Sequence, residues 1–438
     1  MRKFKGKAIL IVLALCLVLS LTACASEGDT KAETTTAKSQ ETTTTEATEK
    51  TEEKEEVKLV AIIERTDQSY MEAVLDKINE HFADYDIVIK GWDTNAVETT
   101  VKTMIASGNP CDLVFYWPNY MNTFVESGMA LDLTPYLEAN NGEWKNSFVE
   151  GSLEIGKYDG KYYNIAVHSV YPMLIANKDL TDKAGVTLPE GDWTWEEFLD
   201  VCDTIKTELD VFPFGIKDSH ACWIVRNGFL TIWEDKSEID AFINGEIPFT
   251  VPEVKKVLDD TKILYDNEYC YPGKGALIVT LEELKAAFKD EKIAMFAYVN
   301  SQAKVIVDDS GLENVQIVSW PHMGPNDYLL GGCDGYFIPS NSVYVDEAVE
   351  LLKYITGPDC MQLVADAGTP VTTKGVTSTD PNILQYARDT SKVYPGEVIN
   401  LSSKLNEAIN KKLPADYINS GDTVIERLEA LRLEVLED

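Results

Sequence analysis

The residues best suited to contact a ligand follow three short apolar runs near the start of the chain. Each run has the composition of a buried strand, and the runs cover residues 58–63, 87–89 and 112–116. The residues that follow them are Glu64 and Arg65, Trp92 and Asp93, and Trp117. Charged side chains form charge-assisted hydrogen bonds, and Trp rings offer large flat apolar surfaces. The pattern predicts a site that binds a small molecule.

The segments between these runs have the spacing of helices. Met71, Val74 and Ile78 recur at helical intervals, and residues 94–106 form a second periodic segment that ends at Gly108. This alternation predicts an α/β fold, with doubly wound sheets covered by helices on both faces. Ligands of such sheets bind at the carboxyl ends of the strands, where the candidate residues stand. A chain of 438 residues also exceeds one ordinary core, so we expect two domains.

Residues 158–180 are predicted to connect the two domains. Pro172 interrupts an apolar run that is rich in β-branched and aromatic residues, which is typical of a strand that passes from one folded half to the other. His168 and Tyr171 stand just before this proline and are candidates for the wall of a ligand site. Trp320 also precedes a proline, and it marks a second candidate crossing with a candidate ligand contact.

The remaining candidates lie in the middle of the chain. Trp223 and Arg226 open a predicted helix at 221–233 and combine an aromatic platform with a charge. Asn300 follows a predicted strand, and Asp334 follows two consecutive glycines. Each candidate has a plainer alternative. A Trp can belong to the core, a polar residue can cap a helix or face solvent, and a histidine can be a hydrogen-bonded structural residue.

The N-terminus has the pattern of a secreted lipoprotein. Four basic residues precede an apolar segment at 8–21, and this segment ends at Cys24 after small residues. We expect residues 1–24 to be a signal peptide, Cys24 to be lipidated, and the protein to be anchored to the outer face of the cell membrane. Residues 25–56 are rich in Thr and Glu without aromatic residues, which predicts a disordered tether.

Composition excludes several function classes. A net charge of −34 at pH 7 argues against nucleic-acid binding. The sequence has no phosphate-binding loop, dinucleotide fingerprint or serine-hydrolase motif, and its four histidines form no zinc motif. We therefore expect no cofactor and no metal. The six cysteines after Cys24 show no metal-ligand spacing and are predicted to be small buried thiols, with disulfides as the alternative.

Four stretches carry a resemblance to a known family. They are residues 105–114 (IASGNPCDLV), 158–163 with 175–180 (YDGKYY and IANKDL), 193–199 (WTWEEFL), and 335–339 with the helix at 348–356. Together with the lipoprotein signal, they resemble the extracellular solute-binding proteins of bacterial ABC importers. The resemblance is to the carbohydrate-binding family that includes maltose-binding proteins, and it covers the whole mature chain.

The resemblance implies two α/β lobes of the type II periplasmic-binding-protein fold, joined by three crossings. Lobe one is expected at 57–167 and 320–370, and lobe two at 168–319 and 371–438. The family implies a monomer that captures an extracellular sugar, in particular an oligosaccharide, between the lobes by hinge closure. It also implies delivery to the permease subunits of the importer, without enzymatic activity.

Two alternatives stay open at this point. The same fold can bind a polyol phosphate, a peptide or a cation in place of a sugar. A surface-anchored carbohydrate-active enzyme is the second alternative, although no acidic pair stands in a catalytic motif. A sugar site requires aromatic platforms and polar groups that bind hydroxyls, which is the composition of the candidate residues.

Overall fold

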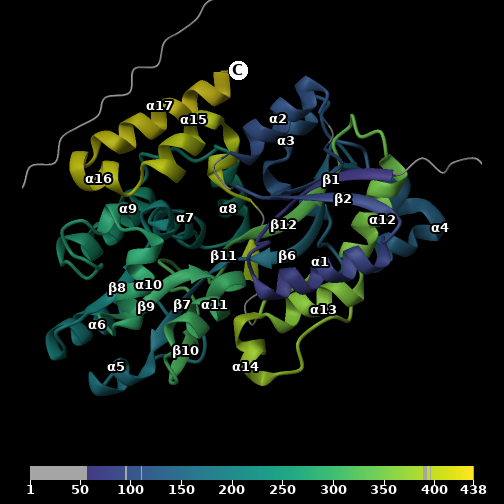
Figure 1. The fold of residues 1–438 in the computed structure, drawn as a ribbon. Coiled ribbons are helices and arrows are strands. Elements are labelled where there is room, and N and C mark those ends of the chain that lie inside the picture. The colour runs from purple at the N-terminus through teal and green to yellow at the C-terminus, as the bar shows by residue number, and fades with distance from the viewer. Residues whose placement is uncertain (1–56, 94–95, 110, 388–391, 395, 438) are drawn as a thin grey trace, which may run out of the picture. The chain divides into compact units, whose positions relative to one another are not determined.

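The computed structural model describes residues 57–437, apart from residues 94–95, 110, 388–391 and 395. The predicted signal peptide, Cys24 and the tether lie outside these residues. The first sheet has the strand order β2-β1-β3-β12-β6 (Figure 1). Its strands are β1 (Val57–Ile63), β2 (Tyr85–Gly91), β3 (Leu113–Tyr116), β6 (Ile165–Val170) and β12 (Gly332–Phe337).

The register of the first sheet brings the candidate loops together. Strand β1 pairs in parallel with β2 and with β3, so the loops after all three strands lie at one edge. Strand β12 returns antiparallel to β3 and β6, which makes the sheet mixed. The three predicted N-terminal strands are confirmed, and so is the expectation that their carboxyl ends share an edge.

Helices cover both faces of this sheet, as the apolar periodicity predicts. Ile63 packs with Met71 of α1 on one face, where α12 and α13 also lie, and Val60 packs with Val101 of α2 on the other. Apolar residues that alternate along β1 therefore serve two separate cores. The helices are α1 (Ser69–His81), α2 (Val97–Ser107), α3 (Asn122–Val125), α4 (Thr134–Asn146), α12 (Val345–Ile355) and α13 (Pro358–Asp366).

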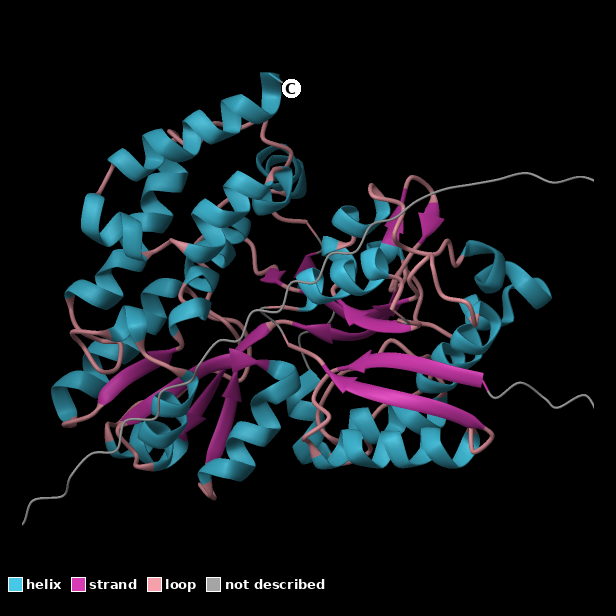
Figure 2. Cartoon of the chain, turned by 45° about the horizontal axis from the view of Figure 1, so that its top comes forward, coloured by secondary structure: helices cyan, strands magenta, loops and turns pink. Residues whose placement is uncertain are grey.

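The second sheet has the order β10-β7-β9-β8 (Figure 1). Figure 2 shows the strands of the chain in magenta and the helices in cyan. The strands of the second sheet are β7 (Pro172–Asn177), β8 (Phe212–Ile216), β9 (Ile293–Val299) and β10 (Val315–Val318). Its helices are α5 (Lys178–Lys183), α6 (Trp195–Glu208), α7 (Cys222–Thr231), α8 (Lys236–Ile243), α9 (Pro252–Asp266), α10 (Leu281–Lys289) and α11 (Asn300–Ser310). Strand β8 and helix α11 are absent from the sequence-based assignment, because β8 is short and contains Pro213 and Gly215, and α11 begins and ends with polar residues that suit turns.

The last part of the chain packs with the second sheet. Leu405, Tyr417 and Leu428 belong to its core. This part contains α14 (Pro381–Leu384), α15 (Ser403–Asn406), α16 (Ala415–Ser420) and α17 (Thr423–Glu437). Two small two-stranded sheets complete the fold. One pairs β4 (Lys157–Tyr158) with β5 (Lys161–Tyr162), and the other pairs β11 (Leu329–Leu330) with β13 (Val393–Tyr394). No helix of the described residues is both long and apolar enough to cross a membrane.

The chain passes between the sheets at Tyr171. Strand β6 belongs to the first sheet and β7 to the second, so the predicted interruption at Pro172 separates two strands that serve different cores. The next return to the first sheet occurs at Gly332, later than the sequence suggested. Trp320 and Leu329 are buried in the core of the second sheet, so the crossing predicted at Trp320 comes too early in the chain. The exact lobe boundaries stay a prediction.

Helix α6 begins at the predicted cap. The Thr194 hydroxyl accepts a hydrogen bond from the Glu197 backbone N–H, and the Glu197 carboxylate accepts one from the Thr194 N–H at 2.8 Å. This capping box satisfies two N–H groups at the helix start. All six cysteines of the described residues are free thiols, and all except the half-buried Cys333 are buried, as expected.

We expect Thr194→Ala to lower the free energy of unfolding by about 1 kcal/mol, because the helix then loses one of its capping partners. Urea unfolding followed by far-ultraviolet circular dichroism measures this loss. Thr207→Ala, at an exposed position near the other end of the same helix, is the matched control and is expected to change little. Equal effects of the two substitutions would show that the cap does not stabilise the helix.

Candidate functional site

Three aromatic side chains gather at the carboxyl edge of the first sheet. Trp92 follows β2, Trp117 follows β3, and Tyr120 lies in a short 3-10 helix, η1 (Pro118–Tyr120). The Trp92 and Trp117 rings meet edge to face with centroids 5.1 Å apart, and Trp117 meets Tyr120 at 5.9 Å. All three are half-buried, so each keeps surface that a ligand can contact.

A second set of rings lies at the carboxyl ends of two strands of the second sheet. His220 ends a 3-10 helix after β8, Trp223 lies in the first turn of α7, and Tyr298 lies near the end of β9. The His220 and Trp223 rings are stacked, with centroids 3.7 Å apart and planes inclined by 16°. Tyr298 lies 5.2 Å from His220. Burial lowers the pKa of His220 well below its usual value, which keeps this imidazole neutral at pH 7.

A buried ion pair connects α7 with the C-terminal segment. Arg226 donates from Nε to Glu397 at 2.7 Å and from Nη2 to the other carboxylate oxygen at 2.5 Å. Its Nη1 donates to Asn410 at 2.8 Å. Burial raises the pKa of Tyr120 in the first lobe to about 12, and the charge of Arg226 in the second lobe acts in the opposite direction. We call the six rings, namely Trp92, Trp117, Tyr120, His220, Trp223 and Tyr298, the aromatic group.

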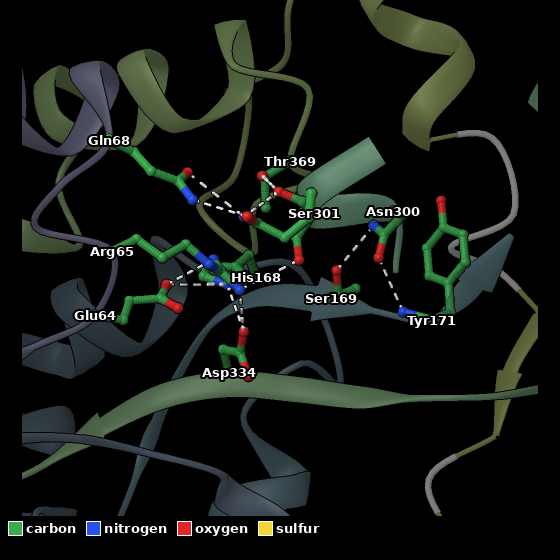
Figure 3. A network of polar contacts seen from close by, with 11 residues as sticks. Glu64, Arg65, Gln68, His168, Ser169, Tyr171, Asn300, Ser301, Asp334 and Thr369 are labelled. Atoms are coloured by element: carbon green, nitrogen blue, oxygen red, sulfur yellow. Dashed lines mark hydrogen bonds and ion pairs between the residues drawn. The ribbon is translucent and has the colours of Figure 1, made fainter. Parts of the chain in front are cut away.

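A compact set of ionisable residues comes from the end of β1 and from the neighbouring strands β6 and β12 (Figure 3). Arg65 Nη1 donates to Glu64 at 2.9 Å, and Arg65 Nη2 donates to Asp334 at 3.2 Å. His168 Nε2 lies 2.8 Å from Asp334 Oδ2 and 3.4 Å from Glu64 Oε1. Glu64, His168 and Asp334 are at most 4% exposed. We call Glu64, Arg65, His168 and Asp334 the polar cluster.

The two carboxylates of the polar cluster have opposite pKa shifts. Burial raises the pKa of Glu64 to about 7, although Arg65 and His168 act against this rise. Met71, Val74 and Met361 line the small space beside it and exclude water from its carboxylate. The pKa of Asp334 is lowered: its burial acts to raise it, but the hydrogen bond and the charge of His168 and the charge of Arg65 together outweigh that effect.

The polar cluster contains three groups with the chemistry of metal ligands. Ligand atoms of Glu64, His168 and Asp334 lie within 4.8 Å of one another. The Arg65 guanidinium, however, bonds both carboxylates and lies 3.3 Å from His168 Nε2, so it already supplies the positive charge at this place. Arg65 also has a left-handed backbone with φ 47°, a strained conformation that is common at functional sites. We therefore describe this cluster as a charge network.

The structure brings together some of the predicted site residues. Trp92, Trp117, Trp223 and Arg226 contribute to the aromatic group and its ion pair, and Glu64, His168 and Asp334 form the polar cluster. Asp93 is exposed beside Trp92, and its carbonyl oxygen accepts hydrogen bonds from Ala96 and Val97 at the start of α2.

Three predicted residues lie apart from the aromatic group and have structural contacts. Tyr171 is 1% exposed, and its N–H donates to the Asn300 side chain at 2.9 Å. Asn300 also donates to the Ser169 carbonyl, so its amide holds the crossing in place. Trp320 is 5% exposed within the second core. Their burial leaves these side chains little surface for a ligand.

Sequence reasoning missed half of the aromatic group and the partners of Arg226. The missed residues are Tyr120, His220, Tyr298, Glu397 and Asn410. Tyr120 follows a predicted strand and Tyr298 ends another, so their positions at strand ends could have marked them as candidates. Glu397 and Asn410 lie in a segment without a recognisable pattern, and 171 and 184 residues separate them from Arg226.

A separate cavity of about 800 Å³ lies beside the crossing segments. Ser169, Cys333 and Pro370 line it together with apolar residues such as Ile383 and Val393. Its described lining contains no aromatic ring and one charged residue, Glu150. This composition lacks the flat rings that sugar recognition uses.

Comparison with known proteins identifies the family. Residues 63–361 match the family model of bacterial extracellular solute-binding proteins. A protein of Brucella abortus (strain 2308) that is described as a binding protein is 24% identical over 271 residues, which are 61% of this chain and 63% of that protein. This chain therefore matches less than two thirds of the length of that curated relative.

Solved structures share the fold. A chitin oligosaccharide binding protein superposes with a TM-score of 0.74 at 18% identity, covering 87% of this chain and 100% of its own. A protein from work on xylan utilization by Caldanaerobius polysaccharolyticus superposes with a TM-score of 0.72 at 22% identity, covering 86% and 99%. These likenesses establish a two-lobed periplasmic-binding-protein fold. With the family model matching most of its length, the chain belongs to the bacterial extracellular solute-binding protein family.

Proposed function

We propose that this protein captures an extracellular sugar, in particular an oligosaccharide, between its two lobes and delivers it to the permease of an ABC importer. The aromatic group carries the proposal, because its half-buried rings come from strand ends of both sheets, and the charge of Arg226 acts on Tyr120 of the first and on His220 of the second. Sugars present C–H faces that stack on such rings and hydroxyls that bond to charged partners. Structural relatives include a chitin oligosaccharide binding protein and a protein bound to raffinose, which supports a sugar as the ligand class.

The number of rings is sufficient for useful affinity. A stacked ring contributes about 1 kcal/mol beyond the area that it buries. Micromolar binding requires about 8 kcal/mol in total. Stacking on two or three members of the aromatic group, together with apolar burial and hydrogen bonds to Arg226 and Glu397, reaches this magnitude.

The charges around the aromatic group favour a neutral ligand over a phosphate. Arg226 has its charge balanced by Glu397, and Arg65 has its charge balanced by Glu64 and Asp334. An anionic ligand would have to compete with these buried carboxylates inside a protein with a net charge of −34. Neutral hydroxyls can instead bond to the remaining donors and acceptors without separating the pairs.

The remaining parts of the proposal follow from the family. Lobe one is proposed to comprise residues 57–170 and 332–370, and lobe two residues 171–331 and 371–438, because β6 and β12 belong to the first sheet and Trp320 to the second core. The lobes close over the ligand by hinge bending, and the permease binds the closed form. The chain acts outside the cytoplasm as a monomer, is attached to the membrane through lipidated Cys24, and releases its sugar unchanged, without a cofactor.

Isothermal titration calorimetry with neutral xylo-, chito- and galacto-oligosaccharides tests the ligand class. We expect micromolar binding of at least one series by the wild type. Trp117→Ala and Trp223→Ala should each weaken this binding by about tenfold, because each removes one stacking surface. Their melting temperatures should stay near that of the wild type, since both rings are half-buried.

Trp320→Ala is the matched control, because it removes the same ring from the core. It should melt well below the wild type, and its affinity, measured where it is folded, should change less than that of Trp117→Ala. Absence of binding to every sugar at millimolar concentration would refute the proposal. Release of shortened products, detected by chromatography, would instead support the enzyme alternative.

A further inference from the structure

Two glutamine side chains bridge the lobes at the start of α1 and of α11. Gln68 Nε2 donates to the Gln302 side-chain oxygen at 2.7 Å, and Gln302 Nε2 donates in return at 3.5 Å. The Gln302 amide is also held from within its own lobe, because its Nε2 donates to the Ser301 carbonyl at 2.9 Å. This bond fixes the orientation of the amide that Gln68 meets.

Each glutamine is carried by an element of a different core. Gln68 immediately precedes α1, where its carbonyl accepts a hydrogen bond from the Glu72 N–H at 2.9 Å, and Met71 of this helix is buried in the first core. Gln302 lies in the first turn of α11, whose Ile306 is buried in the second core. The two amides therefore meet only while the starts of α1 and α11 are close. Separating the lobes at this place breaks their bonds.

A further bond spans the lobes beside the glutamine pair. Arg65 Nη2 donates to the Ser301 hydroxyl at 3.3 Å (Figure 3). From the first lobe, Glu64 and Asp334 accept hydrogen bonds from the same guanidinium at 2.9 Å and 3.2 Å and so fix its position. Ser301 is 3% exposed, and its carbonyl accepts a hydrogen bond from the Thr369 hydroxyl at 3.4 Å. Together with the glutamine pair, these bonds give the first turn of α11 three partners in the first lobe.

We call Arg65, Gln68, Ser301 and Gln302 the inter-lobe clasp. The glutamine pair of the clasp lies at the face of the first sheet on which α1 packs with α12 and α13. Trp117 and Tyr120 of the aromatic group pack instead against the core on the opposite face, with α2 and α3. The glutamine pair is therefore separate from the rings of the first lobe on which a sugar is proposed to stack.

We propose that the inter-lobe clasp supplies part of the free energy of lobe closure, so that residues which do not touch the ligand help to set how tightly the ligand is held. The bonds of the clasp join the lobes to each other directly, in addition to the contacts that a ligand makes with both. The effect of the clasp on sugar affinity rests on the proposed function, whereas its effect on the arrangement of the lobes does not.

The direction of the effect follows from the linkage between closure and binding. A ligand held by both lobes binds tightly only while they are together, so a contact that stabilises this arrangement also strengthens binding. Gln68 and Gln302 are neutral and half-buried, so a hydrogen bond of ordinary net strength is expected between them. Such a bond changes an equilibrium constant by about fivefold.

Calorimetry of glutamine variants with a neutral sugar that binds is the first test. Gln68→Ala and Gln302→Ala should each weaken binding by about fivefold. The double variant should bind no more weakly than the weaker single variant, because the same bond is lost in all three. Gln316→Ala is the matched control, since this half-buried glutamine bonds the Pro189 carbonyl within the second lobe, and it should keep the wild-type affinity. Equal affinities of Gln68→Ala and Gln316→Ala, or single effects that multiply in the double variant, would refute the clasp.

Small-angle X-ray scattering without ligand tests the clasp independently of sugar binding. Gln68→Glu combined with Gln302→Glu places like charges where the amides meet, and Gln68→Lys combined with Gln302→Glu places opposite charges there. At low salt, the radius of gyration of the like-charged variant should exceed that of the oppositely charged variant. The difference should shrink at about 1 M salt, where charges are screened beyond about 3 Å. Because both variants are changed at the same two positions, a general loss of packing would affect them alike.

The two measurements separate failure of the clasp from failure of the proposed function. If no sugar binds but the like-charged variant is expanded relative to the oppositely charged one, the proposed function fails and the clasp stands. If sugars bind but the two radii of gyration are the same at low salt, the clasp is refuted and the proposed function stands.

Discussion

Replacing Arg226 with methionine is expected to lower the free energy of unfolding by about 3–5 kcal/mol. The substitution leaves the Glu397 carboxylate without its bidentate partner, in a place where its side chain is only 9% exposed. Asn410 loses a donor in the same step. A buried charge without a partner costs far more than the pair contributed, which is why a single side chain has so large an effect. Urea unfolding followed by tryptophan fluorescence measures the change.

Two further variants separate this explanation from a general loss of packing. Arg226→Met combined with Glu397→Leu removes both charges and should recover most of the lost stability. Arg427→Met breaks an ion pair with Asp416 whose side chains are 47% and 33% exposed, and it should change the free energy of unfolding by less than about 1 kcal/mol. An Arg226→Met protein as stable as the Arg427→Met protein would show that the buried pair is energetically unimportant.

The second large effect is a dependence of stability on pH through Glu64. The pKa of its carboxyl is about 7 in the folded protein against an ordinary value of 4.5, so the folded state retains a proton that the unfolded state releases. Stability from this group is present in full below pH 4.5 and is lost as the pH rises to about 7. The loss amounts to about 3 kcal/mol. Thermal unfolding in buffers between pH 4.5 and pH 8 measures it.

Glu64→Gln isolates this contribution, because glutamine does not titrate. The difference in free energy of unfolding between wild type and Glu64→Gln should fall across pH 4.5–7 and then become constant. Comparison of the two proteins is necessary because the pKa of His220 is also shifted, and it is lowered. The protein therefore loses stability at His220 as the pH falls below the ordinary value of 6.5, which is opposite to the effect of Glu64. The pKa of Asp334 is lowered too, and its contribution to stability changes only below pH 3.8, its ordinary value. A difference that does not vary with pH would show that Glu64 is ionised in the folded protein.

Local sequence signals were sufficient for part of the site. Trp92 and Trp117 could be placed because each follows a strand whose apolar run is readable, and parallel pairing puts their loops at one edge. Glu64 was predicted for the same reason. Its role in a charge network with His168 and Asp334 could not be predicted, because that depends on the antiparallel return of β12 beside β6. A contact between residues so far apart in the chain has no local pattern.

The second crossing shows where local reasoning fails. The proline after Trp320 reads as the end of an element, yet the chain continues along the second lobe because Trp320 and Leu329 find apolar partners there. The burial of apolar side chains in the second core therefore determines the path of the chain here, and the turn-forming proline does not. Glu397 escaped prediction for the related reason that its segment has no period of its own and is positioned by Arg226.

The contacts of Tyr171 bear on how the lobes can move. Its backbone N–H is bonded to Asn300 at the start of α11, and its hydroxyl donates to the Tyr386 carbonyl in the C-terminal segment at 3.0 Å. One residue of the crossing is thus fastened to two other segments of the chain. Both partners belong to the second lobe, so these bonds hold the second-lobe end of the crossing in place. We therefore expect the crossing to bend in the backbone that precedes Tyr171.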